Sequence, residues 1–128
     1  MGFKVISASD APRSVGPYSQ ATLAGQFIFC SGQGGFDPAT MRLVEGGIGE
    51  QTRQTLRNIE AILHAAGSDL ASVVKVTVFL HDWSHFSEMN EVFAEFFPSN
   101  PPARSTIRGE RWPPGSLVAI EAIAMASP

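Results

Sequence analysis

The chain has 128 residues, of which 44% are hydrophobic, and this is enough apolar material to build one core. Its nine basic and twelve acidic residues give a formal net charge of -3, which argues against a nucleic-acid partner because affinity for phosphates rests on Lys and Arg. No apolar run approaches the roughly 20 residues that cross a bilayer, and the longest candidate, residues 117–126, is interrupted by Glu121. We therefore expect a single domain over residues 1–128 with neither a membrane nor a nucleic acid as partner.

The cysteine content and the first residues bear on the cell compartment. Cys30 is the single cysteine, so the chain can form neither an internal disulfide nor a cysteine-based zinc cluster, which fits a reducing environment. The first five residues lack the basic region and long apolar stretch that mark a secretory signal. The prediction is a cytoplasmic protein.

The first third of the chain predicts three strands. Residues 3–7 read as a short strand, and residues 10–17 as a loop because their prolines fix φ and remove amide donors. Residues 18–23 are expected to form the second strand, which a tight turn at Gly25-Gln26 joins to a third strand in a hairpin. The third strand is predicted over residues 27–31 and should deliver a polar tip at Ser31-Gly32-Gln33.

The middle of the chain predicts two helices around one strand. Apolar residues recur at helical spacing between residues 46 and 67, and Gly67 favours a left-handed cap at the end of this long helix. Residues 73–80 are β-branched and apolar, which is typical of a central strand. A second helix follows and ends before Pro98, with one apolar stripe made of Phe86, Met89, Phe93 and Phe97.

The last two strands are predicted over residues 104–108 and 117–125, on either side of a Pro-Pro-Gly turn at residues 113–115. The resulting order predicts an α+β fold in which two helices pack on one face of a mixed six-stranded sheet. Apolar residues are expected on both faces of this sheet, notably at Val76, Val78, Leu80, Ile120 and Ala122. Because an uncovered apolar face would be a large hydrophobic patch, we expect copies of the chain to associate through it.

Two histidines were considered as metal ligands. His81 and His85 lie four residues apart, but they straddle the end of a strand and the start of a helix, which is not the geometry of two ligands on one helical turn. Asp82 or Ser84 is expected to cap the helix there. No metal site is predicted.

Neither Ser31 nor Cys30 has the neighbouring motif of a nucleophile. The glycine-rich residues 31–35 lack the lysine of a phosphate loop and the spacing of a dinucleotide fingerprint. Cys30 is therefore expected to be a small buried hydrophobic residue, and phosphate binding is not predicted.

Arg104 lies between a proline-rich loop and a predicted strand, where its guanidinium could point into a crevice. A guanidinium is a planar fork of donors that can bind a carboxylate through two hydrogen bonds. An arginine at the start of a strand is more often solvated or ion-paired, so the residue by itself leaves both roles open.

A series of motifs spans nearly the whole chain in a fixed order. They are Ala11-Pro12, Gly16-Pro17-Tyr18-Ser19-Gln20-Ala21, Ser31-Gly32-Gln33, Gln51-Thr52 with Asn58-Ile59, Val74-Lys75-Val76-Thr77-Val78-Phe79, Asn90 and Pro102-Ala103-Arg104-Ser105-Thr106. Together they resemble the RidA (YjgF/UK114) family. The resemblance implies a chorismate-mutase-like α+β fold assembled as a homotrimer, with the sheets forming a central barrel and the helices outside.

The resemblance also implies an activity and a site. Archetypal members hydrolyse reactive 2-imino and 2-enamino acids, such as 2-aminoacrylate, to 2-keto acids and ammonia in clefts between subunits, without a cofactor. Arg104 would hold the substrate carboxylate, and orienting the electrophilic imine carbon beside a held water would supply most of the rate effect. The residues that would line or shape the pocket, partly through their backbone, are Tyr18, Ser31, Gly32, Asn90 and Thr106.

One position departs from the family pattern. Where the pattern has a glutamate that positions the attacking water, this chain has Ala119. Glu121 matches a second glutamate of the pattern and is a possible accessory acid, but it lies roughly 7 Å further along the strand and cannot simply take the vacant place. The loss of a negative charge makes the pocket roomier and more attractive to a bulkier or more anionic ligand.

Imine hydrolysis could therefore be weakened or changed in substrate, and two alternatives stay open. One is a non-catalytic trimer that binds or senses a small carboxylate. The other is an endoribonuclease, against which the acidic balance and the lack of a paired acid and base both weigh.

Overall fold

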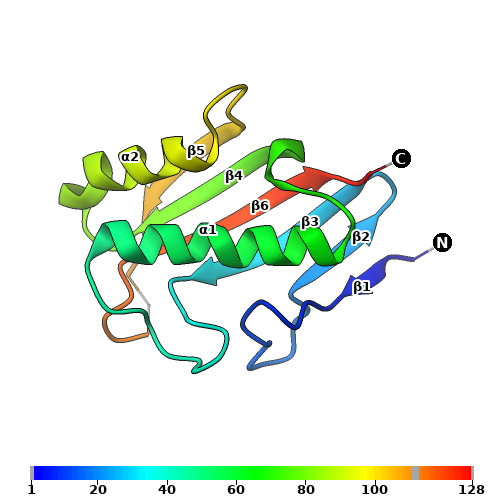
Figure 1. Cartoon of the computed structure of the whole chain (residues 1–128), viewed down its shortest axis with the longest axis horizontal. Coiled ribbons are helices and arrows are strands. Elements are labelled where there is room, and N and C mark those ends of the chain that lie inside the picture. The colour runs from blue at the N-terminus through cyan, green and yellow to red at the C-terminus, as the bar shows by residue number, and fades with distance from the viewer. Residues whose placement is uncertain (1, 111–112, 128) are drawn as a thin grey trace.

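A computed structural model describes residues 2–110 and 113–127. The predicted order of elements is confirmed, and Figure 1 shows their arrangement. The helices and strands are β1 (Lys4–Ile6), β2 (Ala21–Ala24), β3 (Phe27–Gly34), α1 (Ile48–Ala65), β4 (Val73–Leu80), α2 (Phe86–Phe96), β5 (Ala103–Arg108) and β6 (Val118–Met125), with short 3-10 turns η1 (Leu70–Ser72) and η2 (Trp83–His85).

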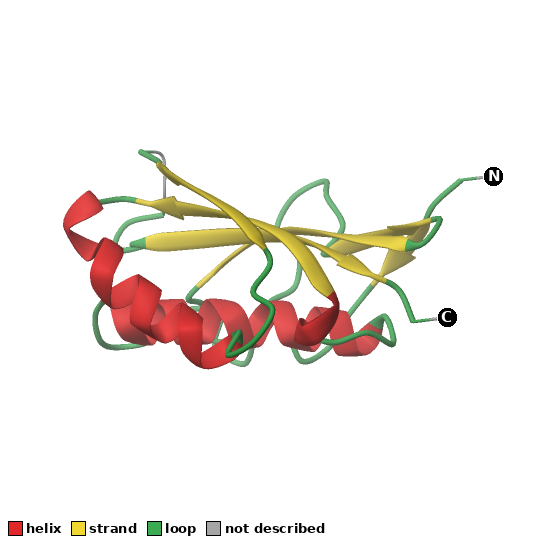
Figure 2. Cartoon of the chain, turned by 90° about the horizontal axis from the view of Figure 1, so that it is seen from above, coloured by secondary structure: helices red, strands yellow, loops and turns green. Residues whose placement is uncertain are grey.

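The six strands form one sheet in the order β1-β2-β3-β6-β4-β5. Strands β4 and β5 are parallel and the other neighbours are antiparallel, so the sheet is mixed, as predicted. Both helices cover the same face of the sheet, and no helix formed by residues 2–110 or 113–127 lies on the other face (Figure 2). No helix in residues 2–110 or 113–127 is both long enough and apolar enough to span a bilayer.

The core lies between α1 and the centre of the sheet. Leu56, Ile59, Ile62 and Leu63 on α1 are at most 1% exposed. Full burial of each such side chain contributes about 1.5–3 kcal/mol, so this face of α1 fixes the helix to the sheet. Gly67 ends the helix with φ +78°, and the amide of Ser68 donates to the Leu63 carbonyl at 2.8 Å, which confirms the predicted left-handed cap.

Five apolar strand residues were expected to lie on both faces of the sheet, and this expectation was wrong because all five lie on one face. Val76, Val78, Leu80, Ile120 and Ala122 are all buried on the helix side, because the antiparallel register pairs Val78 with Ile120 and Val76 with Ala122. The open face has a different and more mixed surface. It exposes 40–43% of Phe27, Phe29 and Met125, and it also carries polar side chains at Lys75, Thr77 and Glu121.

Two predicted strand limits were also wrong. The second strand begins at Ala21 and leaves Tyr18 in a loop, where the Tyr18 amide donates to the Gly16 carbonyl at 2.8 Å across Pro17. Strand β3 continues to Gly34 through a register shift between Cys30 and Gln33, so Ser31-Gly32-Gln33 lies inside a strand that pairs again with β6.

Three buried amide side chains hold the loops at one end of the sheet. Gln20 accepts from the Ala8 amide at 2.6 Å and donates to the Pro12 carbonyl at 2.7 Å. Gln51 on α1 accepts from the Leu117 amide and donates to the Gly115 carbonyl, at 2.8 and 2.9 Å. A third amide, that of Asn58 on α1, donates to the carbonyls of Gly34 and Phe36 at 3.1 and 2.9 Å.

We predict that Asn58→Ala lowers the free energy of unfolding by about 2–4 kcal/mol, because it removes the amide that donates to the carbonyls of Gly34, at the end of β3, and of Phe36. Asn58 is 1% exposed, so water cannot easily replace its amide. Urea denaturation measures the change, and Gln26→Ala at an exposed turn is the control, expected to stay within about 0.5 kcal/mol of the wild type. A loss for Asn58→Ala no greater than for the control would contradict the role of this amide.

Candidate small-molecule site

Two adjoining hollows lie at the end of the sheet where the amide-held loops meet. The Tyr18 compartment has a volume of about 360 Å³ and the Ala119 compartment about 370 Å³. We call them together the cleft, because they share the lining residues Gly32, Gln33, Gly34, Phe36 and Pro113. The Tyr18 compartment adds Pro12, Arg13, Val15, Tyr18 and Met41, and the Ala119 compartment adds Phe79, Ser116 and Ala119.

Tyr18 lies on the loop before β2 and is 49% exposed. Its hydroxyl oxygen accepts a hydrogen bond from the Val15 amide at 3.4 Å, so the hydroxyl proton remains available to a ligand. Gly32 borders both compartments, and a Cβ built there would meet no atom within 4 Å. The structure thus brings these two predicted residues to one cleft.

Ser31 holds a loop in place and does not line the cleft, unlike Gly32 and Gln33 of the same motif. Its hydroxyl donates to the Ser19 carbonyl at 2.6 Å and its amide donates to the Gln20 carbonyl at 2.9 Å. It therefore fastens the Tyr18 loop to β3, and it is not among the described residues that line either compartment.

The charge of the cleft is one-sided. Arg13 lines the Tyr18 compartment and is exposed. No Asp, Glu or His is found among the described lining residues of either compartment. The described part of the cleft can therefore attract an anion, but it offers no carboxylate or imidazole as a general base.

Arg104 lies on the opposite side of the sheet, between edge strand β5 and helix α2. It pairs with buried Val76, so its side chain is on the helix face, where its guanidinium carbon lies 4.9 Å from the ring centroid of Phe93 and 5.8 Å from that of Phe86. Partial burial lowers the pKa of Arg104 from its usual high value, and the group stays cationic at neutral pH. No hydrogen bond or ion pair joins it to another group in the described part of the chain.

Two other predicted residues belong to the same region. Thr106 lies two residues beyond Arg104 on the same face of β5. Asn90 lies on the stripe of α2 that carries Phe86 and Phe93, and its Oδ1 atom is buried without a hydrogen-bond partner. A buried unpaired oxygen is uncommon, so this corner of the fold has polar capacity that the chain itself does not satisfy.

The predicted site residues are therefore not all together in one chain. Strands β3 and β5 are separated by β6 and β4, which places them about 14 Å apart at the usual strand spacing. Glu121 is in neither group, because it lines a hollow of about 310 Å³ on the open face with Lys75 and Thr77. A single chain thus presents a cleft with Tyr18 and Gly32 and, separately, an aromatic-backed cation at Arg104.

Two other reactive side chains, those of Cys30 and Asp82, have structural roles. Burial raises the pKa of the Cys30 thiol to about 12, so the thiol stays protonated at neutral pH and behaves as the predicted buried hydrophobic residue. Asp82 caps η2 by accepting a hydrogen bond from the Ser84 amide at 2.9 Å. Hydrogen bonding to Ser84 lowers the pKa of the Asp82 carboxyl. No group of three metal-ligating side chains is found among residues 2–110 and 113–127.

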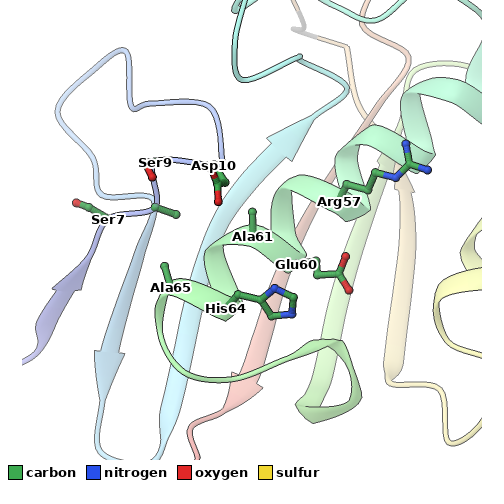
Figure 3. A pocket seen from close by; sticks show the side chains of 9 residues that line it. Ser7, Ser9, Asp10, Arg57, Glu60, Ala61, His64 and Ala65 are labelled. Carbon is green, nitrogen blue, oxygen red and sulfur yellow. The ribbon is translucent and has the colours of Figure 1, made fainter.

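A further hollow of about 420 Å³ lies between the N-terminal segment and α1 (Figure 3). Ser7, Ser9 and Asp10 lie on one side of it, and α1 contributes Arg57, Glu60 and His64 on the other. Its charges are of both signs and largely exposed, and none of the site residues predicted from the sequence lines it.

Sequence reasoning missed the contacts around Arg104 and most of the cleft lining. Phe86 and Phe93 were predicted only as part of an apolar stripe, and their rings also face the guanidinium. Phe36, Phe79 and Pro113 are far apart in sequence, and no local pattern predicts that they border one compartment. Trp112, which directly precedes the Pro-Pro-Gly turn in the sequence, lies outside the described residues.

The fold and the two clusters define an α+β protein with a small-molecule cleft and an arginine suited to an anion. The model of the family described as endoribonuclease L-PSP matches residues 8–126, and the chain belongs to this family, which confirms the RidA resemblance seen in the motifs.

A human relative, 2-iminobutanoate/2-iminopropanoate deaminase, is 46% identical over 98% of this chain and 91% of its own length. The crystal structure of RidA from an Antarctic Psychrobacter species has a TM-score of 0.91 and 43% identity, covering 95% of this chain and 98% of that one. The structure of Escherichia coli TdcF with bound serine also has a TM-score of 0.91, at 36% identity over 97% of this chain and 99% of the other.

Proposed function

We propose that this chain hydrolyses small reactive 2-imino and 2-enamino acids to 2-keto acids and ammonia. The near-full-length likeness to a human protein named for the deamination of 2-iminobutanoate and 2-iminopropanoate supports this activity. The observation that carries the proposal is Arg104, a partly buried guanidinium that has no partner among the described residues and lies over two aromatic rings.

Arg104 would bind the substrate carboxylate. A guanidinium that is partly removed from water and has no competing acid binds a carboxylate more strongly than a solvated one. Asn90 and Thr106 would complete this half of the site, with the unpaired Oδ1 of Asn90 available to accept from the imine N–H. The serine bound to TdcF is a small molecule with a carboxylate of this kind.

The full site would form between subunits of a homotrimer. One subunit would supply Arg104 from its edge strand, and its neighbour would supply the cleft with Tyr18 and Gly32. The separation of these two groups within one chain supports this arrangement, as does the mixed apolar surface of the open sheet face.

The reaction needs orientation more than strong acid–base groups. The oxygen of a water molecule forms a bond to the imine carbon while the π electrons of C=N move to nitrogen, and a proton passes from that oxygen to nitrogen. The remaining hydroxyl proton then passes to the same nitrogen, the C–N bond breaks so that its electron pair leaves with ammonia, and the C=O bond forms. Tyr18 can donate a hydrogen bond from its hydroxyl group to the nitrogen, where negative charge develops as the C=N π electrons move onto it.

A second candidate function is a trimer that binds a small carboxylate without turnover. It is favoured because no Asp, Glu or His is found among the described residues that line the cleft. Ala119 is one of these lining residues. Endoribonuclease activity is named in the family's description, and the same lack of an acid and base among the described lining residues weighs against it. RNA cleavage that survives Arg104→Ala would favour it.

Arg104→Ala is expected to lower kcat/KM for 2-iminopropanoate at least about a hundredfold, because truncating one partner of a desolvated charge pair costs about 2–5 kcal/mol. Release of the 2-keto acid from enzymatically generated imine measures the effect. Arg104→Lys, which keeps the charge without the planar fork, should restore only part of the activity.

The matched control is Arg108→Ala, on the same face of β5 but exposed and 3.9 Å from Glu110. It should retain wild-type turnover. Turnover that survives in Arg104→Ala would contradict the proposed role of this residue, and no turnover by the wild type would favour the binding protein.

Phe93→Leu is expected to raise KM about fivefold with a smaller change in kcat, because it removes a cation–π contact worth about 1 kcal/mol that positions the guanidinium. Steady-state kinetics on the same imine separate the two parameters. Phe97→Leu is the control, since Phe97 is also buried and packs 4.6 Å from Phe93 but has no recorded contact with Arg104. Equal changes in KM for the two variants would show that Phe93 acts only through packing.

The shared site can be tested by mixing two defective chains. Arg104→Ala lacks the cation, and Gly32→Leu fills the cleft without a backbone clash. Co-expressed at equal amounts, they should recover about a quarter of wild-type activity, because in a cyclic trimer about one interface in four combines the two intact halves. Activity no greater than the mean of the two parents would contradict a site between subunits.

A further inference from the structure

We propose that the Ala119 compartment binds the side chain of the substrate, and that the preferred substrates are 2-imino acids with an extended apolar side chain, such as those formed from leucine or methionine. This inference rests on the proposed function, and it deepens that function by naming the substrate class. It concerns the cleft itself, whose described lining residues all belong to one chain.

The compartment exists because two small residues lie side by side in the sheet. Ala119 on β6 pairs directly with Gly34 on β3, and on its other side with Phe79 on β4. Cross-strand partners are about 4.5–5.5 Å apart, so a methyl group next to a position without a side chain leaves a depression on the open face. A larger side chain at position 119 would project into it.

Aromatic side chains form the walls of this depression. The ring of Phe36 lies against Gly34, where a Cβ atom would come within 3.1 Å of it. Phe79 lies on the far side of Ala119, and Pro113 adds another apolar surface. A branched or thioether side chain in this position would contact carbon atoms on several sides and gain the free energy of leaving water.

The polar groups of the compartment do not suit a charged side chain. Gln33 and Ser116 are its polar lining residues, and no charged residue is among the described ones. The amide of Gln33 already donates to the Ser31 carbonyl at 3.4 Å, and Arg13 lines the other compartment. A carboxylate or ammonium group placed beside Ala119 would therefore lose hydration without gaining a partner of opposite charge among the described residues.

The volume of the Ala119 compartment also favours a substrate with an extended apolar side chain. At about 370 Å³ it is within the range that holds whole small-molecule ligands, and it continues into the Tyr18 compartment, where the reacting carbon would lie beside the tyrosine hydroxyl. The single methyl of 2-iminopropanoate would leave most of it to water. A four-carbon side chain attached to the same imine carbon would extend into it.

The test compares kcat/KM for 4-methyl-2-iminopentanoate with that for 2-iminopropanoate, each generated by an amino-acid oxidase and followed by release of the 2-keto acid. For the wild type we expect the ratio to favour the larger substrate about tenfold or more, the discrimination that added apolar carbons give in a hydrophobic pocket. Ala119→Leu should lower this ratio at least about tenfold. The control Ala24→Leu makes the same change on the open face of β2, outside the cleft, and should leave the ratio unchanged.

A binding measurement separates failure of this inference from failure of the proposed function. Calorimetry with the unreactive ketones 4-methyl-2-oxopentanoate and pyruvate reports on the compartment without turnover. Tighter binding of the larger ketone that Ala119→Leu abolishes would support the compartment even if no imine were hydrolysed. Hydrolysis of both imines with a ratio near one, unchanged in Ala119→Leu, would overturn the inference and leave the deaminase proposal intact.

Discussion

The structure depends on buried amide side chains that take the place of backbone partners. Gln20, Gln51 and Asn58 each bond to the backbone of a loop at the end of the sheet. An amide carries both donors and an acceptor, so one side chain can satisfy an N–H and a C=O of the same loop. The loops need this support, because an unpaired buried peptide group costs about as much as the hydrogen bond it lacks. Two of the three amides project from α1, so the helix that closes the core also sets the shape of the cleft.

The two halves of the site differ in how they use desolvation. Around Arg104, two aromatic rings shield the guanidinium from water. No acid among the described residues pairs with it, so it favours an incoming anion. In the Ala119 compartment, aromatic and small residues remove water from an apolar surface, which favours a carbon chain. An imino acid has one group of each kind, a carboxylate and a side chain, attached to the same imine carbon. The proposed substrate therefore matches the chemical contrast between the halves as well as the shape of each.

The position of Ala119 links the chemistry to the selectivity. A carboxylate there would lie in the cleft beside Gly34 and could orient a water molecule, but it would also occupy the space that an apolar side chain needs. The methyl group of Ala119 cannot orient a water molecule, but it leaves space for an apolar side chain. The described lining residues of the cleft include no acid, so the proposed rate effect comes from holding the substrate and the water in a reactive geometry, with the Tyr18 hydroxyl as a hydrogen-bond donor in the cleft.

The sequence by itself determined the order of elements, the helix cap at Gly67, the structural character of Cys30 and the family, because each of these depends on local spacing or on a motif read along the chain. It placed the second strand wrongly at Tyr18, since the hydrogen bonds of Gln20 and Ser31 that keep this residue in a loop come from distant residues. Only the tertiary structure decided that Arg104 faces Phe93 and that Gly34, Phe79 and Ala119 meet in one depression. The physical reason is strand register: which side chains become neighbours across a sheet is set by the pairing of segments that are far apart in the chain, and a shift of one residue would turn each of them to the other face.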